Sequence, residues 1–87
     1  MSTVYARQAI ETRYLGPTNH RKGRVVAKCA AGRHTMPWDH ALNITTNHAK
    51  AAEILATRLG WEGPAYLGGT KDGYVVVFAA EGTKVAL

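Results

Sequence analysis

Apolar and polar side chains alternate along the first part of the chain, which is the pattern of strands with one buried face. The alternation predicts strands over residues 4–15 and 24–31, joined by an exposed loop that opens with the turn residues Gly16-Pro17. A shorter strand over residues 33–38 follows at hairpin distance, so we expect the second and third strands to pair antiparallel. Pro37 cannot donate to a strand ladder, which places it at a strand end or a sheet edge.

The two faces of the strand over residues 24–31 differ in chemistry. The face that we expect to be buried carries Val25, Ala27, Cys29 and Ala31. The opposite face carries Arg24, Val26 and Lys28. In this phase Cys29 is a small core residue, whereas a reactive thiolate would need exposure and an electropositive neighbourhood.

A helical period replaces the alternation between residues 47 and 59. The apolar stripe consists of Ala49, Ala52, Leu55, Ala56 and Leu59, with Ala51 beside it. The polar face of the same helix consists of Lys50, Glu53 and Thr57. Thr45, Thr46 or Asn47 is expected to cap the start of this helix. Gly60 is expected to end it in a left-handed conformation, with Trp61 folding back on the last turn.

A second hairpin follows the Gly63-Pro64 break, with strands over residues 65–69 and 74–80 around Asp72-Gly73. The resulting order, βββαββ, predicts an α+β fold: one antiparallel sheet of four to five strands with a single helix packed on one face. Residues 1–87 form a single domain in this prediction, and residues 1–8 and 81–87 are expected to fray. The second face of the sheet must be polar, or covered by a loop, a second subunit or a partner.

Charge is concentrated in the first third of the chain. Residues 1–33 hold seven basic side chains and one acidic side chain, a net charge of +6, while the whole chain carries +5. We expect the contact patch to consist of Arg13, Arg21, Lys22, Arg24 and Lys28. Such asymmetry indicates an anionic partner, either nucleic acid or an acidic protein surface. The alternative is a solvated face that keeps a small protein soluble.

The residues that could form a catalytic or metal site are poorly spaced for either. The four histidines, at positions 20, 34, 40 and 48, are 14, 6 and 8 residues apart, and no such spacing matches a helical or finger-like ligand pair. His20 and His48 are expected on the surface. A Cys29 nucleophile with His34 as its base is the weaker alternative to a core cysteine. We therefore expect no enzymatic activity, no metal ion and no cofactor.

Nucleic-acid binding is compatible with the charge but lacks a recognition module. The chain has no aromatic RNP-type strand, no Gly-x-x-Gly clamp between helices, no finger spacing and no second helix for a helix-turn-helix. Tyr5, Tyr14 or Trp38 could stack on bases if they are exposed. Any binding is therefore expected to be tolerant of sequence and strongly dependent on salt.

Several motifs follow one another in order between residues 9 and 79. They are Ala9-Ile10-Glu11-Thr12-Arg13-Tyr14-Leu15-Gly16-Pro17-Thr18-Asn19, the basic strand of residues 23–29, Pro37-Trp38-Asp39-His40-Ala41-Leu42, the helix start of residues 47–52, Leu59-Gly60-Trp61, and Gly73-Tyr74-Val75. This order resembles a group of short proteins from phages, prophages and other mobile elements. The resemblance implies a phage-type accessory protein, similar in size and setting to anti-CRISPR proteins, which inhibit a CRISPR effector by occupying a nucleic-acid or protein surface. Many such inhibitors mimic DNA with acidic surfaces, whereas this chain is basic, so an acidic protein patch or the effector's RNA suits its charge better.

These observations together predict a non-enzymatic inhibitor of a host defence complex, an anti-CRISPR protein acting on a type I effector. The alternative is a small, sequence-tolerant nucleic-acid-binding protein that uses the same patch. Residues 1–12 hold no apolar stretch of signal-peptide length, and no apolar run approaches the roughly 20 residues that span a bilayer. We therefore expect a cytoplasmic protein of the host bacterial cell with no membrane partner, and a homodimer formed through the uncovered face or an edge strand.

Overall fold

The computed structural model describes residues 3–6, 8–78 and 83–86, and the side chains of residues 8–78. The elements, in chain order, are β1 (Thr3–Ala6), β2 (Ala9–Leu15), β3 (Arg24–Cys29), β4 (Gly32–Pro37), α1 (Ile44–Arg58), β5 (Ala65–Gly69), β6 (Gly73–Phe78) and β7 (Thr83–Ala86). The described elements thus follow the order expected from the sequence, with a short strand added near each end.

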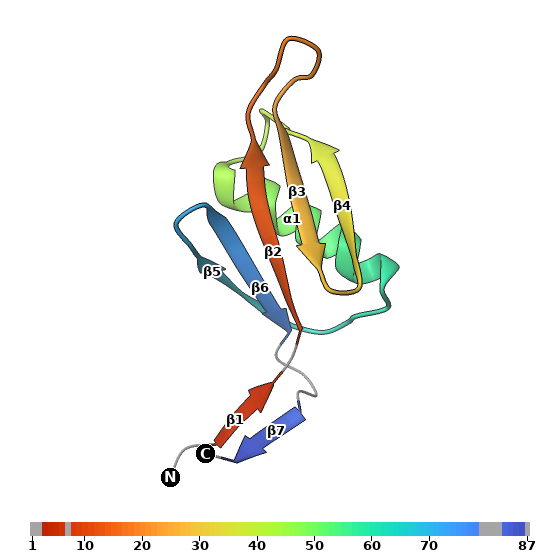
Figure 1. Ribbon diagram of the computed structural model, residues 1–87, viewed down its shortest axis with the longest axis vertical. Helices are drawn as coiled ribbons and strands as arrows, with labels where there is room; N and C mark the ends of the chain where they lie inside the picture. The colour runs from red at the N-terminus through yellow and green to blue at the C-terminus, as the bar shows by residue number, and fades with distance from the viewer. Residues whose placement is uncertain (1–2, 7, 79–82, 87) are drawn as a thin grey trace.

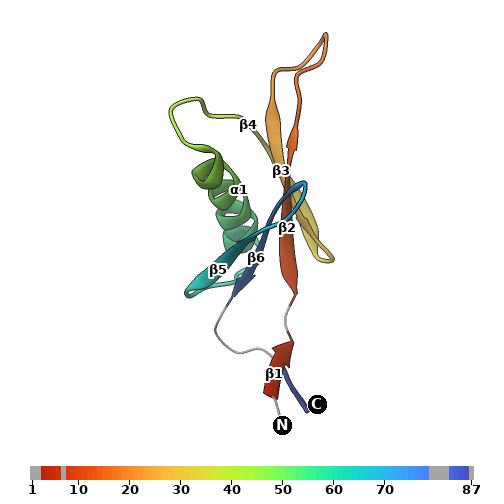
Figure 2. The ribbon, with the colours of Figure 1, turned by 90° about the vertical axis from the view of Figure 1, so that its left-hand side faces the viewer.

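Five of the strands form one antiparallel sheet in the order β4-β3-β2-β6-β5. Helix α1 lies across one face of this sheet and packs against β2, β3, β4 and β6, while nothing in the described chain covers the other face (Figures 1 and 2). The prediction of an α+β fold with a βββαββ order and a single helix on one face is confirmed. We call the face that α1 does not cover the open face.

The chain ends differ from the expected fraying. β1 pairs antiparallel with β7, with Thr3 opposite Ala86 and Ala6 opposite Thr83, as a two-stranded ribbon beyond the end of the main sheet (Figure 1). The expected single strand over residues 4–15 is therefore two strands, β1 and β2. The parts of the predicted frayed ends at residues 1, 2, 7, 81, 82 and 87 lie outside the described residues.

The core lies between α1 and the covered face of the sheet. Its buried members are Ile10, Val25, Ala27, Ala51, Ala52, Leu55, Ala56, Val76 and Phe78. The alternation along β3 is the one expected as far as Cys29, because Val25 and Ala27 are buried and Cys29 packs against the same cluster. Ala31 was expected on the same buried face, but it is exposed in the turn that follows β3, so this part of the prediction is wrong. Pro37 ends β4, and β4 is an edge strand, so both positions predicted for this proline hold at once.

Helix α1 begins earlier than the sequence indicated. The cap is Asn43, whose side chain accepts a hydrogen bond of 2.7 Å from the backbone N–H of Thr46, so the prediction of a cap at residues 45–47 is wrong. That prediction followed the apolar stripe, but the first turn of α1 carries no stripe residue and Ile44 is exposed. No helix in the described part of the chain is long and apolar enough to cross a membrane.

The end of α1 follows the predicted motif. Gly60 has a φ of +77°, and its N–H donates to the carbonyl of Thr57 at 3.1 Å. The N–H of Trp61 donates to the carbonyl of Ala56 at 2.9 Å, which completes a Schellman motif. The Trp61 ring then lies edge-on to Phe78, with ring centroids 6.1 Å apart, so the helix end is joined to the core by an aromatic pair.

Candidate anion-binding face of the sheet

Strand register places most of the predicted cations on the open face. In β2, Ile10 and Thr12 are buried beneath α1, so Glu11 and Arg13 point to the opposite side. Arg13 stands opposite Val26 in β3, and Glu11 stands opposite Lys28. Alternation along β3 therefore brings Arg24 and Lys28 to the same face as Arg13.

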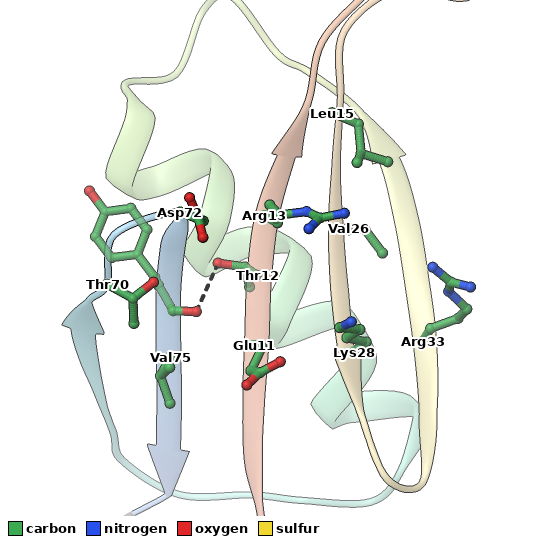
Figure 3. A pocket seen from close by; sticks show the side chains of 11 residues that line it. Glu11, Thr12, Arg13, Leu15, Val26, Lys28, Arg33, Thr70, Asp72 and Val75 are labelled. Carbon is green, nitrogen blue, oxygen red and sulfur yellow. Dashed lines mark hydrogen bonds between the residues drawn. The ribbon is translucent and has the colours of Figure 1, made fainter.

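A shallow depression of about 270 Å³ lies at the centre of this face. Figure 3 views it from the open side, with α1 behind the sheet, and the Arg13 side chain reaches across toward Val26. Val26 is only 4% exposed although it lies on the uncovered face. Long cationic side chains commonly cover an apolar neighbour with their aliphatic stems and keep the charged head in water, which accounts for the burial of Val26.

The depression is also lined by a cation outside the patch that the sequence predicts. Arg33, in edge strand β4, stands directly opposite Lys28 and lines the depression with it. A two-residue turn at Ala30-Ala31 fixes this pairing, whereas the alternation predicted a strand that continues to residue 31, so the sequence pattern did not indicate this register. Arg33 belongs to the basic first third of the chain, and its pairing with Lys28 assigns it to the open face.

The loop between β2 and β3 carries the other two predicted cations. Residues 16–22 are exposed, and the loop extends beyond the sheet (Figure 1). Thr18 and Arg21 form a local turn within this loop. The Thr18 N–H donates to the carbonyl of Arg21 at 2.7 Å, and the Thr18 hydroxyl accepts from the Arg21 N–H at 3.0 Å. Arg21 and Lys22 thus lie at one end of the β2–β3 hairpin, next to Arg24, while Arg13 and Lys28 lie farther along it.

The open face also contains groups that a purely cationic patch would lack. Glu11 lies among the cations in Figure 3, and Asp72 lies at the border of the depression. Toward the β5 edge the face becomes apolar, with Val75, Val77 and Tyr66. Tyr66 is 75% exposed, the highest exposure among the large hydrophobic residues with described side chains.

Tyr14 and Trp38, two of the aromatic residues that could stack on bases, do not belong to this face. Tyr14 is 45% exposed but lies in phase with Ile10, on the side of α1. Its ring packs edge-on against Trp38, with centroids 4.9 Å apart, and Trp38 in turn packs against the core. The Tyr5 side chain lies outside the described side chains.

The remaining candidate side chains are dispersed. No group of three or more histidine, cysteine, aspartate or glutamate side chains within the described residues could hold a metal ion. Cys29 packs against the core cluster. Nδ1 of His34, the base in the alternative catalytic pair, lies 2.9 Å from Nη2 of Arg58, which also donates from Nη1 to the carbonyl of Arg33 at 3.2 Å. Arg58 and His34 therefore join the last turn of α1 to β4.

The prediction of a surface position for His48 is wrong. His48 is 3% exposed and lies between Trp38 and Tyr74, whose rings are 5.9 Å and 4.8 Å from its own. Its Nδ1 shares a hydrogen bond of 2.7 Å with the Thr12 hydroxyl of β2. Burial beneath α1 desolvates the imidazole and lowers its pKa below the ordinary value of 6.5.

This environment predicts a stability that falls in acid. The pKa of His48 is lower in the folded state than in the unfolded state. Between these two pKa values the unfolded state therefore binds more protons than the folded state. The stability that the neutral His48 provides is therefore present in full above pH 6.5, and it is lost as the pH falls through the pKa of the folded state. Urea unfolding at pH 7.5 and at pH 5.0 measures the free energy of unfolding at each pH. This free energy should fall less between pH 7.5 and pH 5.0 in His48→Gln than in the wild type. An equal loss in both proteins would contradict the assignment, and His20→Gln, on the exposed loop, is the matched control.

The comparisons with known proteins add no relative from which residues could be transferred. No protein-family model, no curated protein and no solved structure matches this chain.

Proposed function

We propose that the protein is a non-enzymatic binding protein whose open face binds nucleic acid through the phosphate backbone, with little dependence on base sequence. The observation that carries the proposal is the convergence of Arg13, Lys28 and Arg33 on one depression, with Arg24 and the basic loop continuing along the β2–β3 hairpin. Neighbouring strands are about 4.8 Å apart, so cations on β2, β3 and β4 form a band roughly 10 Å wide. A band of this width can follow a flexible polyanion.

Two features support a role in binding over a role in the stability of the fold. Among the described arginines only Arg58 forms side-chain hydrogen bonds within the protein, and it lies on the other side of the sheet. Nε of Arg24 is buried without a hydrogen-bond partner. Its burial therefore costs desolvation free energy that no hydrogen bond within the protein offsets. Charged groups that form no hydrogen bond within the fold are available to an anionic partner.

The salt dependence of binding tests this proposal. If four cations contact phosphates, the logarithm of the affinity for a single strand should fall with the logarithm of salt concentration with a slope of about −2.8. Lys28→Gln should flatten that slope by about 0.7, and Arg13/Lys28/Arg33→Gln should remove most of the binding. Fluorescence anisotropy with a labelled oligonucleotide, at salt concentrations from low to physiological, measures both.

The matched control is Lys50→Gln, which removes one exposed lysine from the polar face of α1. This variant has the same net charge as Lys28→Gln, so it separates the open face from charge in general. Equal slopes for the two variants, or no binding by the wild type at low salt, would overturn the proposal.

A second candidate is the inhibitor of a host defence complex, an anti-CRISPR protein whose open face contacts an acidic patch on the effector protein. The observation that favours it is Glu11, a carboxylate among the cations that stands opposite Lys28. A carboxylate repels a phosphate backbone but can pair with a basic side chain on a protein surface. The apolar part of the open face, Val75 and Val77, also suits a protein better than a phosphate chain.

Glu11→Gln distinguishes the two candidates. Removing the charge should raise the affinity for nucleic acid if phosphates bind over Glu11, and should lower the affinity for a protein that pairs with it. The protein arm is a pull-down with type I effector complexes, together with the rescue of phage in a CRISPR-immune host. Failure of rescue across several subtypes would remove the inhibitor candidate.

A further inference from the structure

The two edges of the main sheet differ in how they are protected against pairing. Edge strand β4 carries Arg33 and His34 and ends in Pro37. Charges and proline are the usual devices that keep an edge from pairing with another chain. Edge strand β5 has the sequence Ala-Tyr-Leu-Gly-Gly, with neither device. The β5 edge is thus the unprotected edge of this sheet.

We propose that β5 pairs antiparallel with β5 of a second copy of this chain, around a two-fold axis perpendicular to the sheet. The register that pairs all five residues places Leu67 opposite Leu67 of the second copy, and Tyr66 opposite its Gly68. Tyr66 and Gly68 both point to the open face, because they stand opposite Val77 and Val75 of β6. Each tyrosine ring therefore covers a glycine across the axis, and this large-to-small match occurs twice.

The exposure of β5 fits this occupant. Tyr66 is 75% exposed and Val77, directly opposite it on β6, is 36% exposed. A cross-strand aromatic side chain over glycine covers backbone that would otherwise be exposed to water, and it stabilises edge glycines. An added Cβ at Gly68 has only the carbonyl oxygen of Val75 near it, at 4.0 Å, so the space above this glycine is free for the ring of the second copy.

Charge favours β5 over the cationic part of the open face as the contact between two copies. Each chain carries a net charge of +5, so two copies repel one another over most of their surfaces. The five residues of β5 are uncharged, and the helix contacts its neighbours β2, β3, β4 and β6 without packing across β5 (Figure 1). The backbone groups at this edge can pair without bringing charged side chains together.

The dimer extends the candidate binding surface. A two-fold axis perpendicular to the sheet keeps both copies of α1 on one side and joins both open faces on the other. The two cationic bands then lie at the two ends of one continuous face, with the apolar residues of β5 and β6 between them. This consequence rests on the proposed function, whereas the pairing of the two β5 strands does not.

The mass of the protein in solution tests the pairing. Sedimentation equilibrium of the wild type, without nucleic acid, should give twice the chain mass of 9.4 kDa. Gly68→Lys puts a long charged side chain where the tyrosine of the second copy would lie, and Tyr66→Ala removes the ring. Because each substitution occurs twice in the dimer interface, we expect each variant to raise the dissociation constant of the dimer at least about tenfold.

The matched control is Thr35→Lys, which adds the same charge to the open face of the other edge strand, β4, at an exposed position. It should leave the dissociation constant within about threefold of the wild type, since it changes only the long-range repulsion. Equal weakening by Thr35→Lys and Gly68→Lys would overturn the proposal, and so would a wild type that stays monomeric up to about 1 mM. A monomer that binds nucleic acid would remove only the dimer, and a dimer that binds none would remove only the proposed function.

Discussion

Replacing Gly73 with alanine is expected to lower the free energy of unfolding by about 3 kcal/mol or more, because the new methyl group has no space. Gly73 begins β6 and stands opposite Arg13 of β2. A Cβ built there would collide with the carbonyl oxygen of Thr12 and would lie 2.9 Å from its carbonyl carbon and 3.2 Å from the Cα of Arg13. These are backbone atoms of a central strand, so they can move only if the β2–β6 pairing opens.

The requirement for glycine at this position is steric. Among the described glycines, positive φ occurs at Gly60 and Gly63, so Gly73 does not need its conformational freedom. Opening the pairing would also displace Thr12, whose hydroxyl contacts His48 of α1 at 2.7 Å. The loss should therefore extend from the sheet to the helix that packs on it.

Gly32→Ala is the matched control for Gly73→Ala. Gly32 is also the first residue of a strand, but a Cβ there meets only Cδ1 of Leu55 at 3.8 Å, an ordinary contact. Both substitutions restrict the unfolded chain to the same extent. The difference between their effects on the free energy of unfolding therefore measures the steric cost of the methyl group at position 73. Gly32→Ala should change the free energy of unfolding by no more than about 1 kcal/mol. Urea denaturation measures both variants, and similar values for the two would contradict the close approach of β6 to Thr12.

Local patterns along the chain were sufficient to predict most of the fold. Alternation in β3, the helical stripe and the Gly60 cap each depend on neighbours within a few residues, and each is present as expected. Asp72-Gly73 correctly marked the hairpin, although the glycine is required for its fit against β2. The pairing of β1 with β7 joins four-residue segments from opposite ends of the chain, and no local pattern reports such a partner.

The candidate site was predictable to the extent that it depends on alternation. Arg24 and Lys28 share a face because side chains alternate along a strand, as the sequence alone indicated. Arg13 was expected in the same patch, and the pairing of β2 with β3 places it on that face. Arg33 required the register of the next strand as well. His48 was missed because a histidine in the first turns of a helix is usually exposed; here the Thr12 hydroxyl, 36 residues away along the chain, supplies its partner.

Asn47 is expected to be the polar residue on which the connection between β4 and α1 depends most. It is fully buried, and its side chain forms four hydrogen bonds to the backbone of residues 39–43. Oδ1 accepts from the Asp39 N–H at 2.9 Å, while Nδ2 donates to the carbonyls of Asp39 at 2.9 Å, Asn43 at 3.1 Å and Leu42 at 3.3 Å. Asn47→Ala should lower the free energy of unfolding by about 2–4 kcal/mol, because it removes the fully buried amide and leaves partly buried backbone groups of the connection without that partner.

Two further variants separate this network from the capping of α1. Asn43→Ala removes the single exposed cap bond to Thr46 and should cost only about 1 kcal/mol, so an Asn43 variant as unstable as the Asn47 variant would contradict the network. Asn47→Asp keeps the shape and the acceptor but turns a carboxylate oxygen toward carbonyl oxygens, which disfavours the charged form and raises the carboxyl pKa in the folded state. Protonation then stabilises the fold, so the deficit of Asn47→Asp relative to the wild type should shrink between pH 7 and pH 5. A deficit that does not change with pH would mean that the side chain at position 47 turns away from the carbonyls of the connection.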